Sequence, residues 1–228
     1  MAAFRFGVDS FIWTEVFSEK DIWILPKAKE LGFDVVDLAI AHPESFPLEK
    51  VLEAKRQTGL ELVTTTTLGL DTNLISPDEA VRKNGINHMK RMVDINKAIG
   101  SKILGGVNYA GWGYLTRKPR TEREWEWSVS AMREISSYAK ETWDGVIAVE
   151  CVNRFETHFL NIAADAVQYC KDVGNKNMNS CGMPCKRCRR TAFSYPRYDN
   201  THHFHPHHNP HLFRPRNEDH VLPGLTDH

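Results

Sequence analysis

The stretch GVIAVECV, residues 145–152, decides the fold of this chain. Its residues Val146 to Val149 are uninterruptedly apolar, which is typical of a strand buried on both faces of a parallel sheet. Glu150 follows at once and places a charged side chain where the apolar run ends. Functional groups of parallel β/α barrels lie at the carboxyl ends of the strands. Glu150 is therefore the first candidate site residue.

Four more strand-like segments precede this one, and helix-like segments alternate with them. The expected strands are residues 4–9, 35–40, 60–67, 102–107 and 145–152, and the expected helices are 18–31, 47–58, 76–100, 121–142 and 161–173. Regular strand–helix alternation indicates βαβ units, and five such units need a sheet covered on both faces or closed into a barrel. We therefore predict an α/β fold, a partial (β/α)8 TIM barrel of about five β/α units.

Composition sets broad limits on the function. The 228 residues include 41% hydrophobic and 25% charged residues, and 29 basic residues balance 29 acidic ones. A net charge of zero argues against a dedicated nucleic-acid binder. No run approaches the roughly 18 apolar residues of a membrane helix, and the N-terminus lacks a signal-peptide pattern. We expect a cytoplasmic protein with no nucleic-acid or membrane partner.

The alternation stops after Gly174. A sixth strand would fall near KNMNSCGM, residues 176–183, which has no strand pattern. From Gly174 onward there are only four Ile, Leu or Val residues, but six of the eleven prolines and eight of the eleven histidines. Such a composition buries too little apolar surface to offset the entropy of ordering the chain. We predict a barrel domain over residues 1–176 and a mostly disordered His/Pro-rich tail over 177–228.

Two interpretations of this tail stay open. The abrupt loss of pattern is what a shifted reading frame or a retained intron would produce. Alternatively, three cysteines and a histidine-rich run supply soft ligands for a metal such as zinc. These residues are Cys181, Cys185, Cys188 and the stretch 202–211.

The barrel rule also selects candidates around the other strand ends. These are Asp9, Asp37, Thr67, residues 108–112 and residues 150–156. A carboxylate at the end of a buried strand must be paired, protonated or bound to a metal. For Glu150, the alternative to a functional role is a structural salt bridge to an arginine such as Arg154.

The segment VECVNRFETHFLNIAADAV, residues 149–167, resembles the fifth-strand motif of the ketose 3-epimerases. These are the D-tagatose, D-psicose and L-ribulose 3-epimerases, a group within the xylose-isomerase-like TIM barrels. Residues 75–114 resemble the S-P-D helix, fourth strand and tryptophan loop of the family, and residues 31–40 resemble its second strand. The resemblance covers about residues 4–176.

This resemblance implies a metal-dependent C3 epimerisation of ketohexoses or ketopentoses through an enediolate. In the family, a divalent metal holds the ketose, and two glutamates remove and return the C3 proton. The expected ion is Mn²⁺, with Co²⁺ or Mg²⁺ as alternatives. Glu150 matches the first glutamate, a catalytic residue and metal ligand, whereas Glu156 and Trp112 match substrate-binding positions. The implied partner is a ketose sugar, and a homo-oligomer agrees with the family.

The sequence also departs from the family pattern. The next family strand, with an aspartate ligand and a substrate-binding histidine, is absent, and three of four metal ligands have no counterpart. Asp9 stands where many members have an aromatic residue. We therefore expect a truncated chain of impaired activity and low stability, with strand five exposed as a sheet edge. The alternatives are another xylose-isomerase-like enzyme, of hydroxypyruvate isomerase or inosose dehydratase type, or a non-catalytic remnant with a metal-binding tail.

Overall fold

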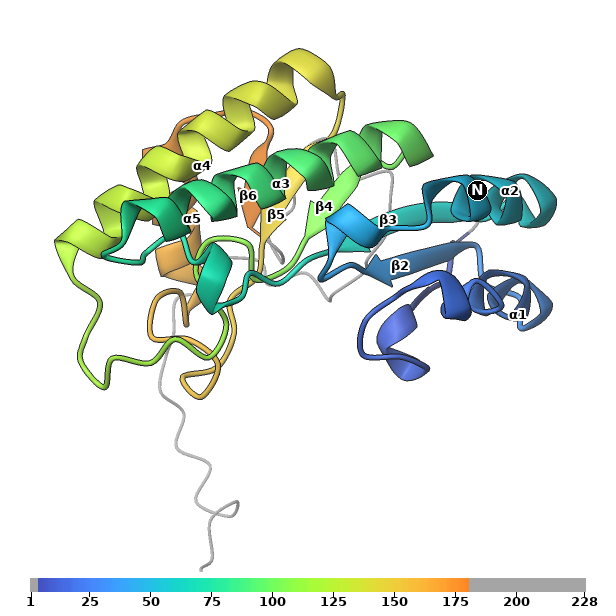
Figure 1. Cartoon of the computed structure of the whole chain (residues 1–228), viewed down its shortest axis with the longest axis horizontal. Coiled ribbons are helices and arrows are strands. Elements are labelled where there is room, and N and C mark those ends of the chain that lie inside the picture. The colour runs from blue at the N-terminus through green and yellow to red at the C-terminus, as the bar shows by residue number, and fades with distance from the viewer. Residues whose placement is uncertain (1–3, 181–228) are drawn as a thin grey trace, which may run out of the picture. The chain divides into compact units, whose positions relative to one another are not determined.

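The computed structural model describes residues 4–180 (Figure 1). Of the tail predicted over residues 177–228, residues 181–228 lie outside the described residues, and the cysteine–histidine cluster is among them. The strands are β1 Gly7–Asp9, β2 Val35–Ala39, β3 Glu61–Thr65, β4 Ile103–Gly105, β5 Val146–Val149 and β6 Met178–Ser180. The helices are α1 Ile24–Glu30, α2 Leu48–Thr58, α3 Glu79–Ile99, α4 Glu122–Thr142 and α5 Ala163–Val173. Short 3-10 helices are η1 Ser10–Ile12, η2 Glu19–Asp21, η3 Pro43–Ser45 and η4 Leu70–Thr72.

The strands form one sheet in the order β1-β2-β3-β4-β5-β6, and every neighbouring pair is parallel. Each helix follows one strand and packs beside the next helix, as α3 and α4 do in Figure 1. Sequential order with parallel pairing is the arrangement of a (β/α)8 barrel wall. The predicted α/β fold of TIM-barrel type is confirmed.

A sixth strand corrects the prediction for residues 176–183. Met178–Ser180 pairs with β5, with Met178 opposite Ile147 and Ser180 opposite Val149. The strand forms because β5 offers a row of backbone donors and acceptors, with which the backbone of any residue except proline can pair. The expectation that strand five is a sheet edge is therefore wrong.

The two faces of the sheet differ in chemistry. Val36 and Leu38 of β2 and Val149 of β5 are fully buried in the core shared with the helices. Side chains alternate between faces along a strand. Asp37 and Glu150 consequently lie on the opposite, inner face, where the barrel axis would run.

Helix ends follow the sequence signals in most cases. Gly59, Gly100 and Gly174 close α2, α3 and α5 with φ values of 66°, 68° and 77°, a left-handed conformation that glycine adopts without a Cβ clash. The N-terminus of α3 is different from the predicted start at Ser76. Asp78 is the N-cap and accepts from the Ala80 amide at 2.8 Å.

One polar residue is part of the core. Asn96 of α3 is fully buried and hydrogen-bonds the Thr64 hydroxyl of β3 and the Met92 carbonyl oxygen, the latter at 2.8 Å. These contacts satisfy its amide and fix α3 against the sheet. Within residues 4–180, no helix has the length and apolarity needed to cross a membrane.

Candidate active site at the end of β5

Backbone hydrogen bonds fix the position of Glu150. Its amide donates to the Gly106 carbonyl oxygen at 3.1 Å, and the Tyr109 hydroxyl donates to its carbonyl oxygen at 2.8 Å. The residue is exposed, and within residues 4–180 it forms no ion pair. The alternative of a structural salt bridge to Arg154 is therefore wrong for this structure. The backbone of Glu150 is therefore fixed by hydrogen bonds, while its carboxylate is free to bind a ligand.

Electrostatics make Glu150 a stronger base than an ordinary glutamate. Neighbouring protein atoms remove part of the hydration of its exposed carboxylate, and this desolvation raises its pKa. The negative charges of Glu156 and Asp9 raise the pKa further. A carboxylate with a raised pKa accepts a proton from carbon more readily, which suits general base chemistry.

The structure brings the other two predicted site residues together. The Trp112 indole Nε1 donates to Glu156 Oε1 at 3.3 Å, and the Gly113 amide donates to the Glu156 carbonyl oxygen at 2.7 Å. Trp112 is 52% exposed, so its ring is available for contact with a ligand rather than buried in the core. Two loops that follow neighbouring strands, β4 and β5, therefore meet beside Glu150.

Asn153 belongs to the predicted segment 150–156, and the structure gives it a specific role that was not predicted from the sequence. Its side-chain amide donates to Glu156 Oε2, while its Oδ1 accepts from the Phe155 amide at 2.8 Å. The second bond closes an Asx turn that returns the chain toward Glu156. An asparagine followed two residues later by a free backbone amide is a local signal for such a turn.

Asp37 adds an unusual carboxyl group on the inner face. It stands in register with Asp9 on β1, its Oδ2 accepts from the Thr65 hydroxyl at 2.7 Å, and its buried Oδ1 has no partner among the described residues. Burial raises its pKa to about 7 against the smaller opposing effect of Thr65, and the charges of Asp9 and Glu150 raise it as well. Asp37 lies within β2 rather than at its end.

Three other candidates have less distinctive surroundings. Burial raises the pKa of Asp9, although the Phe11 amide, which donates to Oδ1 at 2.8 Å, opposes this. Thr67 follows β3 and is half-buried. Asn108, the first residue of the predicted 108–112 segment, is fully buried and donates to the Ala148 carbonyl oxygen at 3.0 Å, so it supports β5.

The resemblance implies a divalent metal at Glu150, and the described residues do not complete a site for one. Within residues 4–180, no group of three or more histidine, cysteine, aspartate or glutamate side chains is arranged to hold a metal ion. The inner-face carboxylates are hard oxygen donors of the kind Mn²⁺ and Mg²⁺ prefer. Glu150 is thus a suitable ligand by chemistry without a described set of partners.

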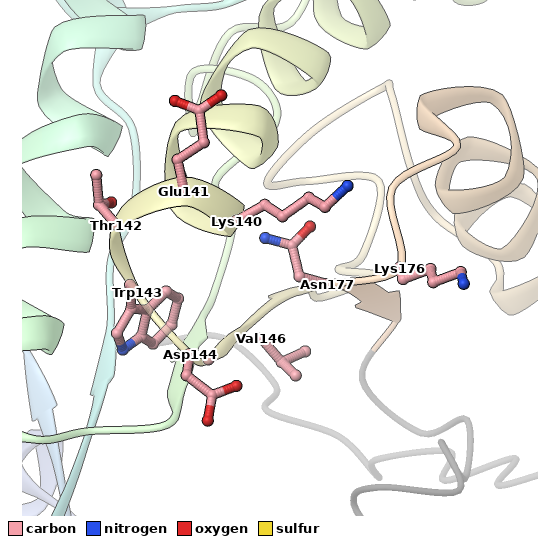
Figure 2. Close-up of a pocket in the computed structure, with 9 residues that line it drawn as sticks. Lys140, Glu141, Thr142, Trp143, Asp144, Val146, Lys176 and Asn177 are labelled. Carbon is pink, nitrogen blue, oxygen red and sulfur yellow. The ribbon is translucent and has the colours of Figure 1, made fainter.

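A separate cavity lies at the other end of β5. It has a volume of about 440 Å³, and Val146, the first residue of β5, is part of its wall together with Lys140, Trp143, Lys176 and Asn177 (Figure 2). Glu150 follows the last residue of the same strand. None of the predicted site residues lines this cavity, so it is distinct from the candidate site.

Comparison with known proteins identifies relatives of the whole arrangement. The chain is 29% identical over 178 residues to L-ribulose 3-epimerase of Mesorhizobium japonicum, an alignment covering 76% of this chain and 58% of the relative. It is 26% identical over 179 residues to D-psicose 3-epimerase of Agrobacterium fabrum, covering 76% and 61%. The chain thus spans about three fifths of the length of these relatives.

Solved structures agree with the fold. A D-psicose 3-epimerase crystallised in the presence of D-fructose superposes with a TM-score of 0.70 at 26% identity, covering 77% of this chain and 62% of that one. D-allulose 3-epimerase of Methylomonas sp. in complex with D-allulose gives a TM-score of 0.72 at 23% identity, covering 77% and 60%.

The family model of the xylose isomerase-like TIM barrels matches residues 25–224, which is most of the chain. The parallel sheet, the relatives and the structural neighbours agree with this match. The chain belongs to the xylose isomerase-like TIM barrel family.

Proposed function

We propose that this chain carries a ketose 3-epimerase site in which Glu150 moves the proton at C3 of the sugar. The observation that carries the proposal is the Glu150 carboxylate itself. It extends from the carboxyl end of a buried strand, forms no ion pair within residues 4–180, and has a raised pKa. The similarity to proteins named L-ribulose and D-psicose 3-epimerase supports this choice of reaction.

The chemistry follows from the position of C3 beside the C2 carbonyl of a ketose. Glu150 takes the C3 proton, and the electron pair left on carbon delocalises onto the carbonyl oxygen as an enediolate. Return of a proton to the opposite face of C3 gives the epimer, and no other atom is gained or lost. The group that returns this proton has no assigned residue within 4–180.

Glu156 and Trp112 are proposed to contact the sugar. The Glu156 carboxylate accepts hydrogen bonds, and its contacts with the Trp112 indole and the Asn153 amide hold it in one orientation. Sugar hydroxyls are suitable donors to it, and the half-exposed indole suits the C–H face of a pyranose or an open-chain ketose. Both residues lie on loops next to Glu150.

A divalent metal belongs to the proposal because of the family resemblance, with Mn²⁺ preferred over Co²⁺ or Mg²⁺. Glu150 is its one proposed ligand within residues 4–180, because this part of the chain holds no three-residue ligand group. We accordingly propose that epimerisation by this chain is impaired.

Binding measurements test the proposal without requiring turnover. We expect isothermal titration of the full chain to detect D-fructose or D-psicose binding in the presence of Mn²⁺, and Glu156→Gln to weaken sugar binding roughly tenfold through loss of charged acceptors. Glu126 is exposed on α4 and its side chain forms no hydrogen bond or ion pair within residues 4–180, so Glu126→Gln is the matched control. Equal binding by Glu156→Gln and Glu126→Gln would refute the assignment of Glu156.

A further inference from the structure

His158 lies two residues after Glu156, and its ring is nearly buried, with 10% of the side chain exposed. Both ring nitrogens have partners. Nδ1 lies 3.0 Å from the Tyr114 carbonyl oxygen, and Nε2 lies 3.2 Å from Glu124 Oε1. A carbonyl oxygen and a carboxylate are both hydrogen-bond acceptors, so each ring nitrogen of His158 faces an acceptor. The two contacts hold the ring on both edges.

Glu124, the partner of His158 Nε2, is itself fixed in position. Its Oε2 accepts from the amide of Thr121 at 2.7 Å and from the hydroxyl of Thr121 at 2.9 Å, which closes the capping box of α4. Burial acts to raise the pKa of Glu124, but hydrogen bonds from Thr121 and His158 outweigh it and lower the pKa. One carboxylate thus caps the helix with one oxygen and binds His158 with the other.

The contacts of His158 join the two loops of the candidate site. Tyr114 lies in the loop that follows β4, two residues after Trp112, and its ring centroid is 5.9 Å from that of His158. His158 itself belongs to the loop that follows β5. Both loops are therefore attached to the N-terminus of α4, a helix of 21 residues that provides a rigid support.

Arg120 strengthens the connection between the two loops and α4. Arg120, directly before the Thr121 cap, donates from Nη1 to the Phe159 carbonyl oxygen at 2.8 Å and lies 3.5 Å from Asp165. His158 thus contacts the carboxylate of Glu124 and the carbonyl oxygen and ring of Tyr114. Arg120 binds the next residue, Phe159. Tyr114 and Arg120, which both follow Trp112 in the loop between β4 and α4, thus bind the segment 158–159.

We propose that His158 is a positioning residue that keeps Trp112 and Glu156 in contact by fastening their loops to α4. Loss of either hydrogen bond of His158 weakens the connection between the loops, which then depends on the bonds of Trp112 and Gly113 to Glu156. The Gly113 amide bond to the Glu156 carbonyl oxygen, 2.7 Å long, reports this connection directly. A consequence for sugar binding rests on the proposed function, whereas the loop geometry itself does not.

Hydrogen exchange of the full chain without sugar tests the proposal at single amides. In His158→Leu, we expect the amides of Trp112, Gly113 and Glu156 to exchange roughly tenfold faster or more, as for the loss of hydrogen bonds to a charged group. Amides of β3 and α3 should keep their wild-type rates. His158→Gln retains donors on a neutral side chain and should recover part of the protection.

Two further variants make the result decisive. Glu124→Gln keeps an oxygen for the Thr121 cap but removes the charge that holds His158, so it should accelerate the same three amides even if His158→Leu fails to fold. His42 is exposed, and its contact with Glu44 at 3.5 Å is a local one. His42→Gln should therefore leave the exchange rates of the three amides unchanged. Unchanged site amides in His158→Leu or Glu124→Gln, or an equal acceleration in every element, would overturn the proposal.

Discussion

Asp37→Asn should remove the loss of stability that ionisation of Asp37 causes between pH 5 and 8. The pKa of Asp37 lies near 7 in the folded chain, against an ordinary value of 3.8. Between these values, the folded chain keeps the proton and the unfolded chain has released it. The contribution of Asp37 to the unfolding free energy must therefore fall as pH rises through this window and level off above pH 7.

The size of the effect follows from the same two values. A pKa rise from 3.8 to about 7 corresponds to about 4 kcal/mol, an upper limit for the stability lost by pH 8. Asparagine keeps an oxygen for the Thr65 hydroxyl, which donates to Asp37 Oδ2 at 2.7 Å, but it cannot ionise. The variant should thus match the wild type below pH 3.8, where the aspartate is protonated in both states, and exceed its stability by a growing margin from pH 5 to pH 7.

Urea unfolding followed by circular dichroism at pH 5, 6, 7 and 8, with EDTA present, measures this difference. Asp71 is exposed, so Asp71→Asn serves as the control and should follow the wild-type pH profile. A stability difference between Asp37→Asn and the wild type that is the same at pH 8 as at pH 5 would contradict this role of Asp37.

Four other changes have defined outcomes. Gly106→Ala should cost at least about 2 kcal/mol of unfolding free energy, because φ is +109° and a Cβ would lie 2.2 Å from a backbone oxygen. Gly113→Ala, with open space around it, should cost only about 1 kcal/mol. Trp112→Phe removes the donor to Glu156 and should weaken ketose affinity several-fold in calorimetry. Asn96→Ala should cost about 2 kcal/mol in urea unfolding, and equal stability would contradict its place in the core.

Much of the fold was predictable because its signals are local. Gly59, Gly100 and Gly174 end helices where no side chain is tolerated easily, and an apolar run defines β5. The start of α3 was misplaced because Ser76 and Asp78 can both cap a helix. The choice of Asp78 is decided by its bond to the Ala80 amide. The strand Met178–Ser180 was missed because its cause is the neighbouring strand rather than its own composition.

The site was predictable in part. Glu150 is marked by a charge after a buried strand, and a family motif marks Glu156. The contact between Trp112 and Glu156, and that between His158 and Glu124, join residues 44 and 34 positions apart. Such pairs depend on how two loops pack, which periodicity and capping signals do not encode.

The central claim is that Glu150 moves the C3 proton of a ketose, and isotope exchange tests it most directly. The full chain is incubated with D-fructose and Mn²⁺ in D2O, and proton NMR follows loss of the C3 hydrogen signal. Exchange requires one base, so it remains measurable even where epimer formation is impaired. We expect exchange by the wild type and by Glu126→Gln, and a loss of at least about a hundredfold in Glu150→Gln, in line with general base catalysis. Exchange that persists in Glu150→Gln, or is absent from the wild type, would contradict the claim.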